Sequence, residues 1–220
     1  MTLYLIGIGL NDAKDITLKG LEFVKKADVV YLESYTSKLN TKVDELEKLY
    51  GKKITIANRK AIEIDSDTIL LKQAKSKGVA LLIVGDVFCA TTHSDLFLRA
   101  RKLKISITVV HNASVLTAIG ITGLQLYKFG KVASIPYANE NVEVPYDALK
   151  QNQSNNLHTL FLLDLTEEGT NSLPIPDAIR YLLKVEMKRG EQVFTEKTIC
   201  VGCAKLGSKD QIIKYGSAKE

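Results

Sequence analysis

The chain has 220 residues, of which 45% are hydrophobic and 25% charged, a composition typical of a globular protein with one large domain or two small ones. Its net charge of +5 is spread along the chain with Lys and Glu intermixed, which indicates a mildly basic surface and argues against a nucleic-acid-binding stripe. The N-terminus lacks a signal-peptide pattern and no apolar run could span a membrane, so we expect a cytoplasmic protein with neither nucleic acid nor membrane as a partner.

Strand and helix patterns alternate along residues 1–110. Short apolar runs with the length of buried strands occur at residues 3–8, 28–33, 53–57, 79–84 and 105–110. Between them, apolar residues recur at helical spacing in the segments 16–24, 43–49, 65–77 and 95–103. This alternation is typical of a mostly parallel sheet covered on both faces, and it predicts an α/β fold for the N-terminal part.

The pattern changes in the second half of the chain. One more strand is predicted at residues 131–136, and the polar loop 137–145 is the best candidate for a linker. Beyond it we predict strands at 157–165, 198–204 and 211–215 and a helix at 177–189. We therefore expect an N-terminal α/β domain over residues 1–136 and a mixed-sheet α/β domain over residues 137–220.

The stretch 78–95 is the most informative part of the sequence. Its buried strand ends at Gly85 and Asp86, and small and hydroxylated residues follow. Open α/β sheets bind small molecules at the carboxyl ends of their strands, and the pair Gly9 and Leu10 and the segment 111–114 end other strands at the same edge. The helix after this stretch is expected to be capped by one of three hydroxyl residues: Thr91, Thr92 or Ser94. A simple strand–turn–helix corner, with Asp86 as a cap, would show the same pattern.

These strand ends do not match the motifs that bind phosphates. Gly7 and Gly9 would begin a G-x-G-x-x-G motif, but its third position is Asp12, which would repel a pyrophosphate. The sequence contains neither a Walker lysine nor a serine nucleophile elbow. The edge suits a ligand held by backbone amides and a carboxylate, a description that S-adenosylmethionine meets without being singled out by it.

Cys200 and Cys203 form a C-x-x-C motif, a spacing that can hold zinc or support redox chemistry. Here they lie in a β-like run, where positions three apart point to opposite faces, and no second cysteine pair accompanies them. We interpret both as buried structural residues and predict no metal. Three cysteines in all, an odd number, also argue against a disulfide framework.

Three motifs in order, LYLIGIGLNDAKDITLKGLE, GDVFCATTH and HNASVLTAIGITGLQLYKFGK, resemble the diphthine synthase family of the tetrapyrrole methylase-like superfamily. The resemblance runs along essentially the whole chain. It implies a homodimeric methyltransferase that uses S-adenosylmethionine, releases S-adenosylhomocysteine, and methylates the 3-amino-3-carboxypropyl histidine of translation elongation factor 2 in diphthamide biosynthesis. In archaeal members the amino group is trimethylated, and in eukaryotic members a carboxylate is methylated as well.

The resemblance also implies which residues contact the cofactor. The family's contacts fall on positions that belong mostly to the strand ends described above: Leu10, Asp86, Cys89, Ser114, Val115, Leu165 and Leu206. The last two of these positions depend on the resemblance alone. Val87 stands where the family usually has proline, which leaves the backbone at this position freer. Family members also continue past the position of Glu220 with a histidine contact, so an incomplete second domain and weaker cofactor binding are expected.

No catalytic residue is assigned from the sequence. His93 and Asp95 lie near the central loop, but a structural hydrogen bond for the first and helix capping for the second are the favoured roles. Two alternative functions stay open. One is a methyltransferase that acts on a tetrapyrrole precursor, and the other is a truncated homologue that binds its partner without turnover.

Overall fold

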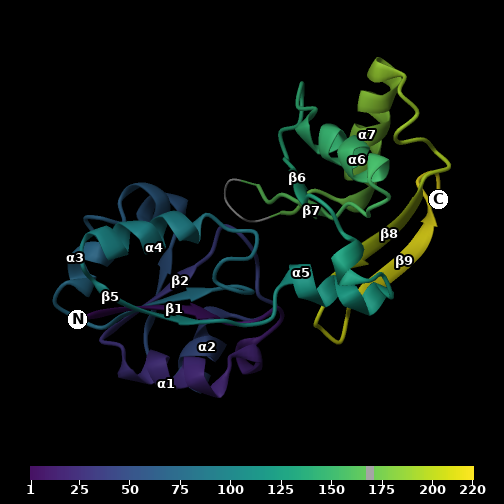
Figure 1. Cartoon of the computed structure of the whole chain (residues 1–220). Helices are drawn as coiled ribbons and strands as arrows, with labels where there is room; N and C mark the ends of the chain where they lie inside the picture. The colour runs from purple at the N-terminus through teal and green to yellow at the C-terminus, as the bar shows by residue number, and fades with distance from the viewer. Residues whose placement is uncertain (167–170) are drawn as a thin grey trace. The chain divides into compact units, whose positions relative to one another are not determined.

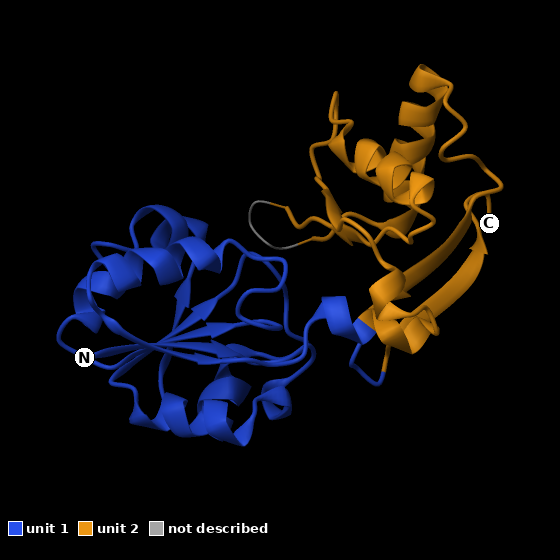
Figure 2. Cartoon of the chain, in the orientation of Figure 1, with its two compact units in different colours: residues 1–118, 206–209 blue, residues 119–205, 210–220 orange. Residues whose placement is uncertain are grey.

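The structure, a computed structural model, describes residues 1–166 and 171–220 and divides into two compact units (Figure 2). Unit 1 comprises Met1–Ala118 together with Leu206–Lys209, and unit 2 comprises Ile119–Lys205 together with Asp210–Glu220. Among the described residues, no helix combines the length and apolar composition needed to cross a membrane.

Unit 1 is built on a five-stranded sheet with the strand order β3-β2-β4-β1-β5, and all four strand pairings are parallel. The strands are β1 (Thr2–Gly7), β2 (Val29–Glu33), β3 (Ile54–Ala57), β4 (Val79–Ile83) and β5 (Ser106–Val110). The parallel sheet predicted from the alternating pattern is confirmed. Its central strands are β4 and β1, so the two sequence runs that end in Gly85 and Gly9 lie side by side.

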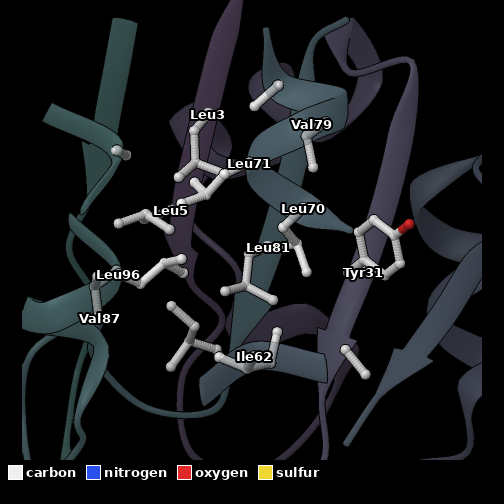
Figure 3. Close-up of a cluster of buried hydrophobic side chains, with 14 of the residues drawn as sticks. Leu3, Leu5, Tyr31, Ile62, Leu70, Leu71, Val79, Leu81, Val87 and Leu96 are labelled. Carbon is white, nitrogen blue, oxygen red and sulfur yellow. The ribbon is translucent and has the colours of Figure 1, made fainter. Parts of the chain in front are cut away.

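Helices cover both faces of this sheet (Figure 1). One face packs against α1 (Leu18–Lys26) and α2 (Val43–Tyr50), and the other against α3 (Leu70–Ala74) and α4 (His93–Lys102). Alternate residues of β4 enter the two cores: Leu81 lies in the α3–α4 core drawn in Figure 3, and Leu82 lies in the α1–α2 core. Because both side chains are fully buried, each contributes about 1.5–3 kcal/mol of hydrophobic stabilisation, and β4 is anchored from both sides.

Local sequence signals explain where the helices of unit 1 begin. Thr17 caps α1, since its hydroxyl accepts a hydrogen bond from the Gly20 amide at 3.0 Å. The expected cap of α4 is not formed in this way. Thr92 occupies the capping position, but its hydroxyl donates to Glu63 instead, and the Thr91 hydroxyl accepts from the His93 amide at 3.3 Å. The start of α4 is therefore held by two threonines with different roles.

The helix predicted over residues 65–77 is shorter than expected. A π-helix, η2 (Lys60–Ile64), precedes it, and the chain turns at residues 65–69 before α3 begins at Leu70. The reason lies in Asp65, Ser66 and Asp67, which favour turns over helix interiors, and the Asp65 carbonyl accepts from two amides of the turn. A 3₁₀ turn, η1 (Ala13–Asp15), follows β1, and α5 (Val115–Ala118) follows β5.

Unit 2 contains two separate two-stranded sheets and two long helices. Two 3₁₀ turns, η3 (Ile119–Thr122) and η4 (Leu126–Lys128), lead into β6 (Ala133–Ile135), which pairs in parallel with β7 (Phe161–Leu163). Helices α6 (Val144–Ser154) and α7 (Ile175–Arg189) pack on this pair, and β8 (Ile199–Ala204) forms an antiparallel hairpin with β9 (Ile212–Ser217). Parallel and antiparallel pairs are both present, but in separate sheets.

A buried carboxylate organises the core of unit 2. Glu186, on α7, accepts hydrogen bonds from the Tyr146 hydroxyl at 2.7 Å and from the amides of residues 192–194 at 2.8–2.9 Å. Burial opposes its ionisation, but these donors hold the pKa of Glu186 at about 2. The carboxylate thus fixes the end of α7 to α6 and to the loop that leads toward β8.

Two details of the second half differ from the sequence prediction. The units divide after Ala118, whereas the expected boundary followed residue 136; β6 belongs to unit 2 because it pairs with β7. Helix α6 was not predicted. Its buried face includes Asn152, whose side chain binds the Lys131 backbone and Thr159, so the apolar periodicity is interrupted where the helix packs.

Candidate functional site

The carboxyl ends of β1 and β4 form the topological switch point of the parallel sheet. From β1 the chain passes through α1 to β2 on one side, and from β4 it passes through α4 to β5 on the other side. Because α1 and α4 cover opposite faces, the loops after these two neighbouring strands separate in opposite directions. Open α/β sheets bind ligands at such a point, which makes this edge the candidate site.

Two glycines join the loops at this edge. Gly9 and Gly85 form a two-residue bridge in which the Gly85 amide donates to the Gly9 carbonyl at 2.7 Å and the Gly9 amide donates back at 3.3 Å. Both have φ near +80°, a conformation that favours glycine. A Cβ atom on Gly9 would overlap Asp15, and one on Gly7 would lie 2.7 Å from the Gly85 carbonyl oxygen. The glycines therefore permit a close approach of backbone that no other residue allows.

Asp86 lies at the centre of the edge, and donors of the protein itself bind its carboxylate. Oδ1 accepts from the Phe88 amide at 3.0 Å; Oδ2 accepts from the Asn112 amide at 3.0 Å and lies 2.8 Å from His111 Nδ1. Burial opposes ionisation, but these hydrogen bonds and the His111 ring outweigh it and hold the pKa of Asp86 below its ordinary value. The carboxylate links the loop after β4 to the loop after β5.

Asn112 extends this link to the first strand. Its side-chain amide donates to the Gly7 carbonyl at 2.9 Å and to the Asp15 carbonyl at 3.0 Å. The Asp15 carboxylate accepts in turn from the backbone amides of Leu10 and Asn11, at 3.2 and 2.7 Å. The ends of β1, β4 and β5 are thus held in one hydrogen-bonded network. Segment 111–114 was predicted as a strand end from the sequence, but the individual roles of Asn112 and Asp15 were not.

Ser114 places an unused polar atom at this edge. It is 3% exposed, and its Oγ has no hydrogen-bond partner among the described residues. Its Cβ lies 4.0 Å from the position that a Cβ on Gly85 would occupy, so the serine faces the glycine bridge. Val115, half-buried, begins α5 directly after it. A buried hydroxyl without a partner is costly, and a bound polar ligand would remove that cost.

The remaining predicted contacts are distributed over both units. Leu10 is half-buried and would contact a Cβ on Gly207 at 3.1 Å, so the segment that contains Leu206 packs on the loop after β1 within unit 1. Cys89 is half-buried in the loop after β4. Leu165 belongs to unit 2, where it forms an isolated bridge with Ser172. Six of the seven predicted residues therefore lie in unit 1.

His93 and Asp95 lie in the first turn of α4. The His93 ring is buried, but neither ring nitrogen forms a hydrogen bond of acceptable geometry within residues 1–166 and 171–220. Asp95 makes an ion pair with Arg99 one turn along α4, at 2.8 Å, rather than capping the helix. Capping was therefore a wrong prediction for Asp95, whereas the backbone carbonyl of Val87 lies close enough to the His93 ring to raise the pKa of this histidine.

Cys200 and Cys203 lie on the hairpin strand β8, opposite Gly216 and Ile213 of β9. Both are half-buried rather than fully buried, and burial raises the pKa of each thiol. Within the part of the chain that the structure describes, no group of three or more His, Cys, Asp or Glu residues is arranged to hold a metal ion.

Comparison with known proteins supplies the chemistry that the geometry leaves open. The family model described as Tetrapyrrole (Corrin/Porphyrin) Methylases matches residues 2–220. Diphthine methyl ester synthase of Homo sapiens is 45% identical over 239 residues, which cover 99% of this chain and 84% of that protein. Diphthine synthase of Methanosarcina mazei is 48% identical over 225 residues, 98% of this chain and 83% of that protein. A crystal structure of a diphthine synthase superposes with a TM-score of 0.91 at 36% identity, covering 100% of this chain and 83% of that one.

Proposed function

Since the chain belongs to the tetrapyrrole (corrin/porphyrin) methylase family, we propose that it transfers methyl groups from S-adenosylmethionine to the 3-amino-3-carboxypropyl histidine of translation elongation factor 2. The chain is a methyltransferase of diphthamide biosynthesis, as its diphthine synthase relatives at 41–48% identity over nearly its whole length indicate. We further propose that it acts in the cytoplasm as a homodimer, in keeping with the family resemblance.

One observation carries the assignment of the cofactor to the switch-point edge: the buried Ser114 hydroxyl without a partner. It lies beside Gly85 and two residues after Asn112, whose amide binds Asp86, and the family resemblance supports a cofactor contact here. The glycine bridge keeps the backbone free of side chains at this point, so a ligand can approach it closely. The residues present therefore fit S-adenosylmethionine, with Leu10, Asp86, Cys89, Ser114, Val115, Leu165 and Leu206 proposed as its contacts.

When bound, S-adenosylmethionine supplies a methyl group on a positively charged sulfur. Displacement at that methyl leaves a neutral thioether, so the protein contributes mainly by alignment and by exclusion of water. The described network suits the first task, because Asp86 and Asn112 hold three strand ends rigidly together. In this proposal the main role of Asp86 is to hold the loop after β4 in position. A direct contact with the cofactor would use the remaining lone pair of Asp86 Oδ1.

Radiolabel transfer tests the function. The protein should label elongation factor 2 that carries the 3-amino-3-carboxypropyl histidine and leave factor with an unmodified histidine unlabelled. Label in a tetrapyrrole precursor would favour the alternative methyltransferase, and cofactor binding without any transfer would favour a non-catalytic homologue. Intact-mass analysis of the product counts the methyl groups, which decides between amine methylation alone and an additional ester.

A serine variant tests the cofactor site. Because Ser114 Oγ makes no hydrogen bond within the described protein, Ser114→Ala should not lower the free energy of unfolding. Its affinity for S-adenosylhomocysteine should fall about threefold to tenfold, the effect of one lost hydrogen bond. Ser154→Ala, at an exposed hydroxyl of α6, is the matched control and should change neither quantity. Unchanged affinity in Ser114→Ala would remove this residue from the site.

A further inference from the structure

A second candidate site lies on unit 1, between the π-helix η2 and the first turns of α4. It is a cavity of about 230 Å³ that is open to solvent and lined by Ile62, Glu63, Thr92, His93, Asp95, Leu96 and Arg99. Ile62 and Leu96, both 2% exposed, belong to the apolar core shown in Figure 3 and form its buried wall. None of the seven proposed cofactor contacts lines it.

His93 presents unused hydrogen-bonding capacity to this cavity. The side chain is 1% exposed, and Nδ1 and Nε2 both lack a hydrogen-bond partner among the described residues. Burial lowers the pKa of His93, an effect that the nearby Glu33 and Glu63 carboxylates and the Val87 carbonyl oppose. The ring is therefore neutral near pH 7, with one nitrogen able to donate toward the Val87 carbonyl and the other left to accept from an occupant of the cavity.

Glu33 does not satisfy this histidine, because its own oxygens are occupied. Oε1 accepts from the amides of Tyr35 and Thr36, and Oε2 accepts from the Thr36 hydroxyl at 2.6 Å. Glu63 accepts fewer hydrogen bonds. Among the described residues, its Oε1 accepts one from the Thr92 hydroxyl at 2.9 Å, and its Oε2 accepts none. The cavity thus contains a neutral imidazole and a carboxylate with free acceptor capacity.

The charge around the cavity is negative. Arg99 lies 2.8 Å from Asp95 and 3.4 Å from Asp67, and its guanidinium also donates to the Ile62 and Glu63 carbonyls. One guanidinium is therefore shared between two carboxylates, while no lysine or arginine among the described residues forms an ion pair with Glu63. The excess of carboxylates favours a cationic occupant.

The size of the cavity narrows the class of occupant. A water molecule takes about 30 Å³, so 230 Å³ is far more than one bridging water needs. Pockets for cofactors and drug-sized ligands usually measure about 300–1,000 Å³, which is larger. The volume matches a single long side chain. A lysine or arginine would place its apolar stem against Ile62 and Leu96 and its charged head near Glu63 and His93.

We propose that this cavity receives a lysine or arginine side chain of the protein substrate, with Glu63 and His93 as acceptors for its N–H groups. The identity of the partner rests on the proposed function. The location fits docking beside the reaction, because the Val87 carbonyl lies near the His93 ring and Val87 directly follows Asp86. A substrate side chain bound in this cavity would contact His93 and would thereby help to hold the loop after β4 in place.

Small probes test the cavity without any enzymatic assay. In protein labelled at its three histidines, methylguanidinium or n-butylammonium should shift the ring resonances of His93 saturably and leave exposed His158 unchanged. Glu63→Gln should weaken the binding of these probes about threefold to tenfold. Asp95→Asn is the second variant, expected to weaken them in the same direction. No shift at His93, or an equal shift with neutral n-butanol, would overturn the proposal.

Steady-state kinetics test the substrate. Glu63→Gln should raise KM for the modified elongation factor about threefold to tenfold, while kcat and the affinity for S-adenosylmethionine stay unchanged. Glu45→Gln, the same change at an exposed position of α2, should alter none of these. An unchanged KM would overturn docking at this cavity. If the wild type transfers no methyl group, the proposed function fails, and the probe titration alone decides whether the cavity binds cations.

Discussion

Replacing Asp86 should destabilise the fold as well as the cofactor site. Its carboxylate accepts from two backbone amides in a buried environment, and it pairs with His111, whose side chain is 68% exposed. A hydrogen bond to a charged group contributes about 1.5–3 kcal/mol net when both partners are buried, and the exposed histidine adds little. Allowing for partial solvation of the freed amides, we expect Asp86→Ala to lower the free energy of unfolding by about 2–4 kcal/mol.

The pH dependence provides the signature of this interaction. The folded-state pKa of Asp86 is below its ordinary value of 3.8, so its ionised form stabilises the folded state at any pH above that value. The contribution is lost as the pH falls through the folded pKa. The difference in stability between wild type and Asp86→Asn should therefore be largest near neutral pH and shrink below about pH 4.

Urea unfolding followed by circular dichroism measures these differences, since the chain has no tryptophan to report by fluorescence. His111→Gln serves as the control and should cost less than about 0.5 kcal/mol, because it removes only the exposed partner. A loss below about 1 kcal/mol for Asp86→Ala, with no dependence on pH, would refute the role of this carboxylate as a link between strand ends.

Three further predictions follow from the same geometry. A positive φ alone costs an alanine about 1–2 kcal/mol, and Gly51→Ala, which has open space around its Cβ, should lose only that amount of stability in urea unfolding. Gly9→Ala should lose far more, because its Cβ would also overlap Asp15. Glu186→Gln should be destabilising near pH 7 and much less so as the pH falls from 4.5 toward about 2, where wild-type Glu186 takes up its proton; acid titration of both proteins checks this. Purified wild type should hold no stoichiometric zinc by metal analysis, and the double change Cys200→Ala with Cys203→Ser should retain methyl transfer.

Much of unit 1 could be predicted because its central strands, β1 and β4, are almost wholly buried and therefore form short continuous apolar runs. The run at residues 79–84 contains no polar residue, and its first five residues form β4, at the centre of the sheet. The glycines and Asp86 that end the strands were also found from sequence, since a strand end with small residues is a local feature. What could not be predicted is how Asp86 is used. Its partners His111 and Asn112 lie about 25 residues away, and only the strand order brings them together.

The second half shows why periodicity fails in a small unit. Helix α6 places a buried Asn152 against the chain at Lys131, so one position of its packed face is polar. Pro145 was interpreted as the end of a linker, whereas it lies in the first turn of α6, a position that proline favours. His93 illustrates the opposite case: a polar residue on a helix start was expected to be satisfied locally, and the fold leaves its ring without a hydrogen bond of acceptable geometry among the described residues.

The chain passes from one unit to the other three times, after residues 118, 205 and 209. Residues 206–209 complete the surface of unit 1 at Leu10, although residues 119–205 separate them in the chain from the rest of that unit. During synthesis on the ribosome, the N-terminal sheet can assemble early, but the loop after β1 gains its neighbour at Gly207 only after residues 119–205 have been made. A fragment ending at residue 118 would consequently keep the parallel sheet and lack this cover, so vectorial folding delivers the scaffold first and covers Leu10 later.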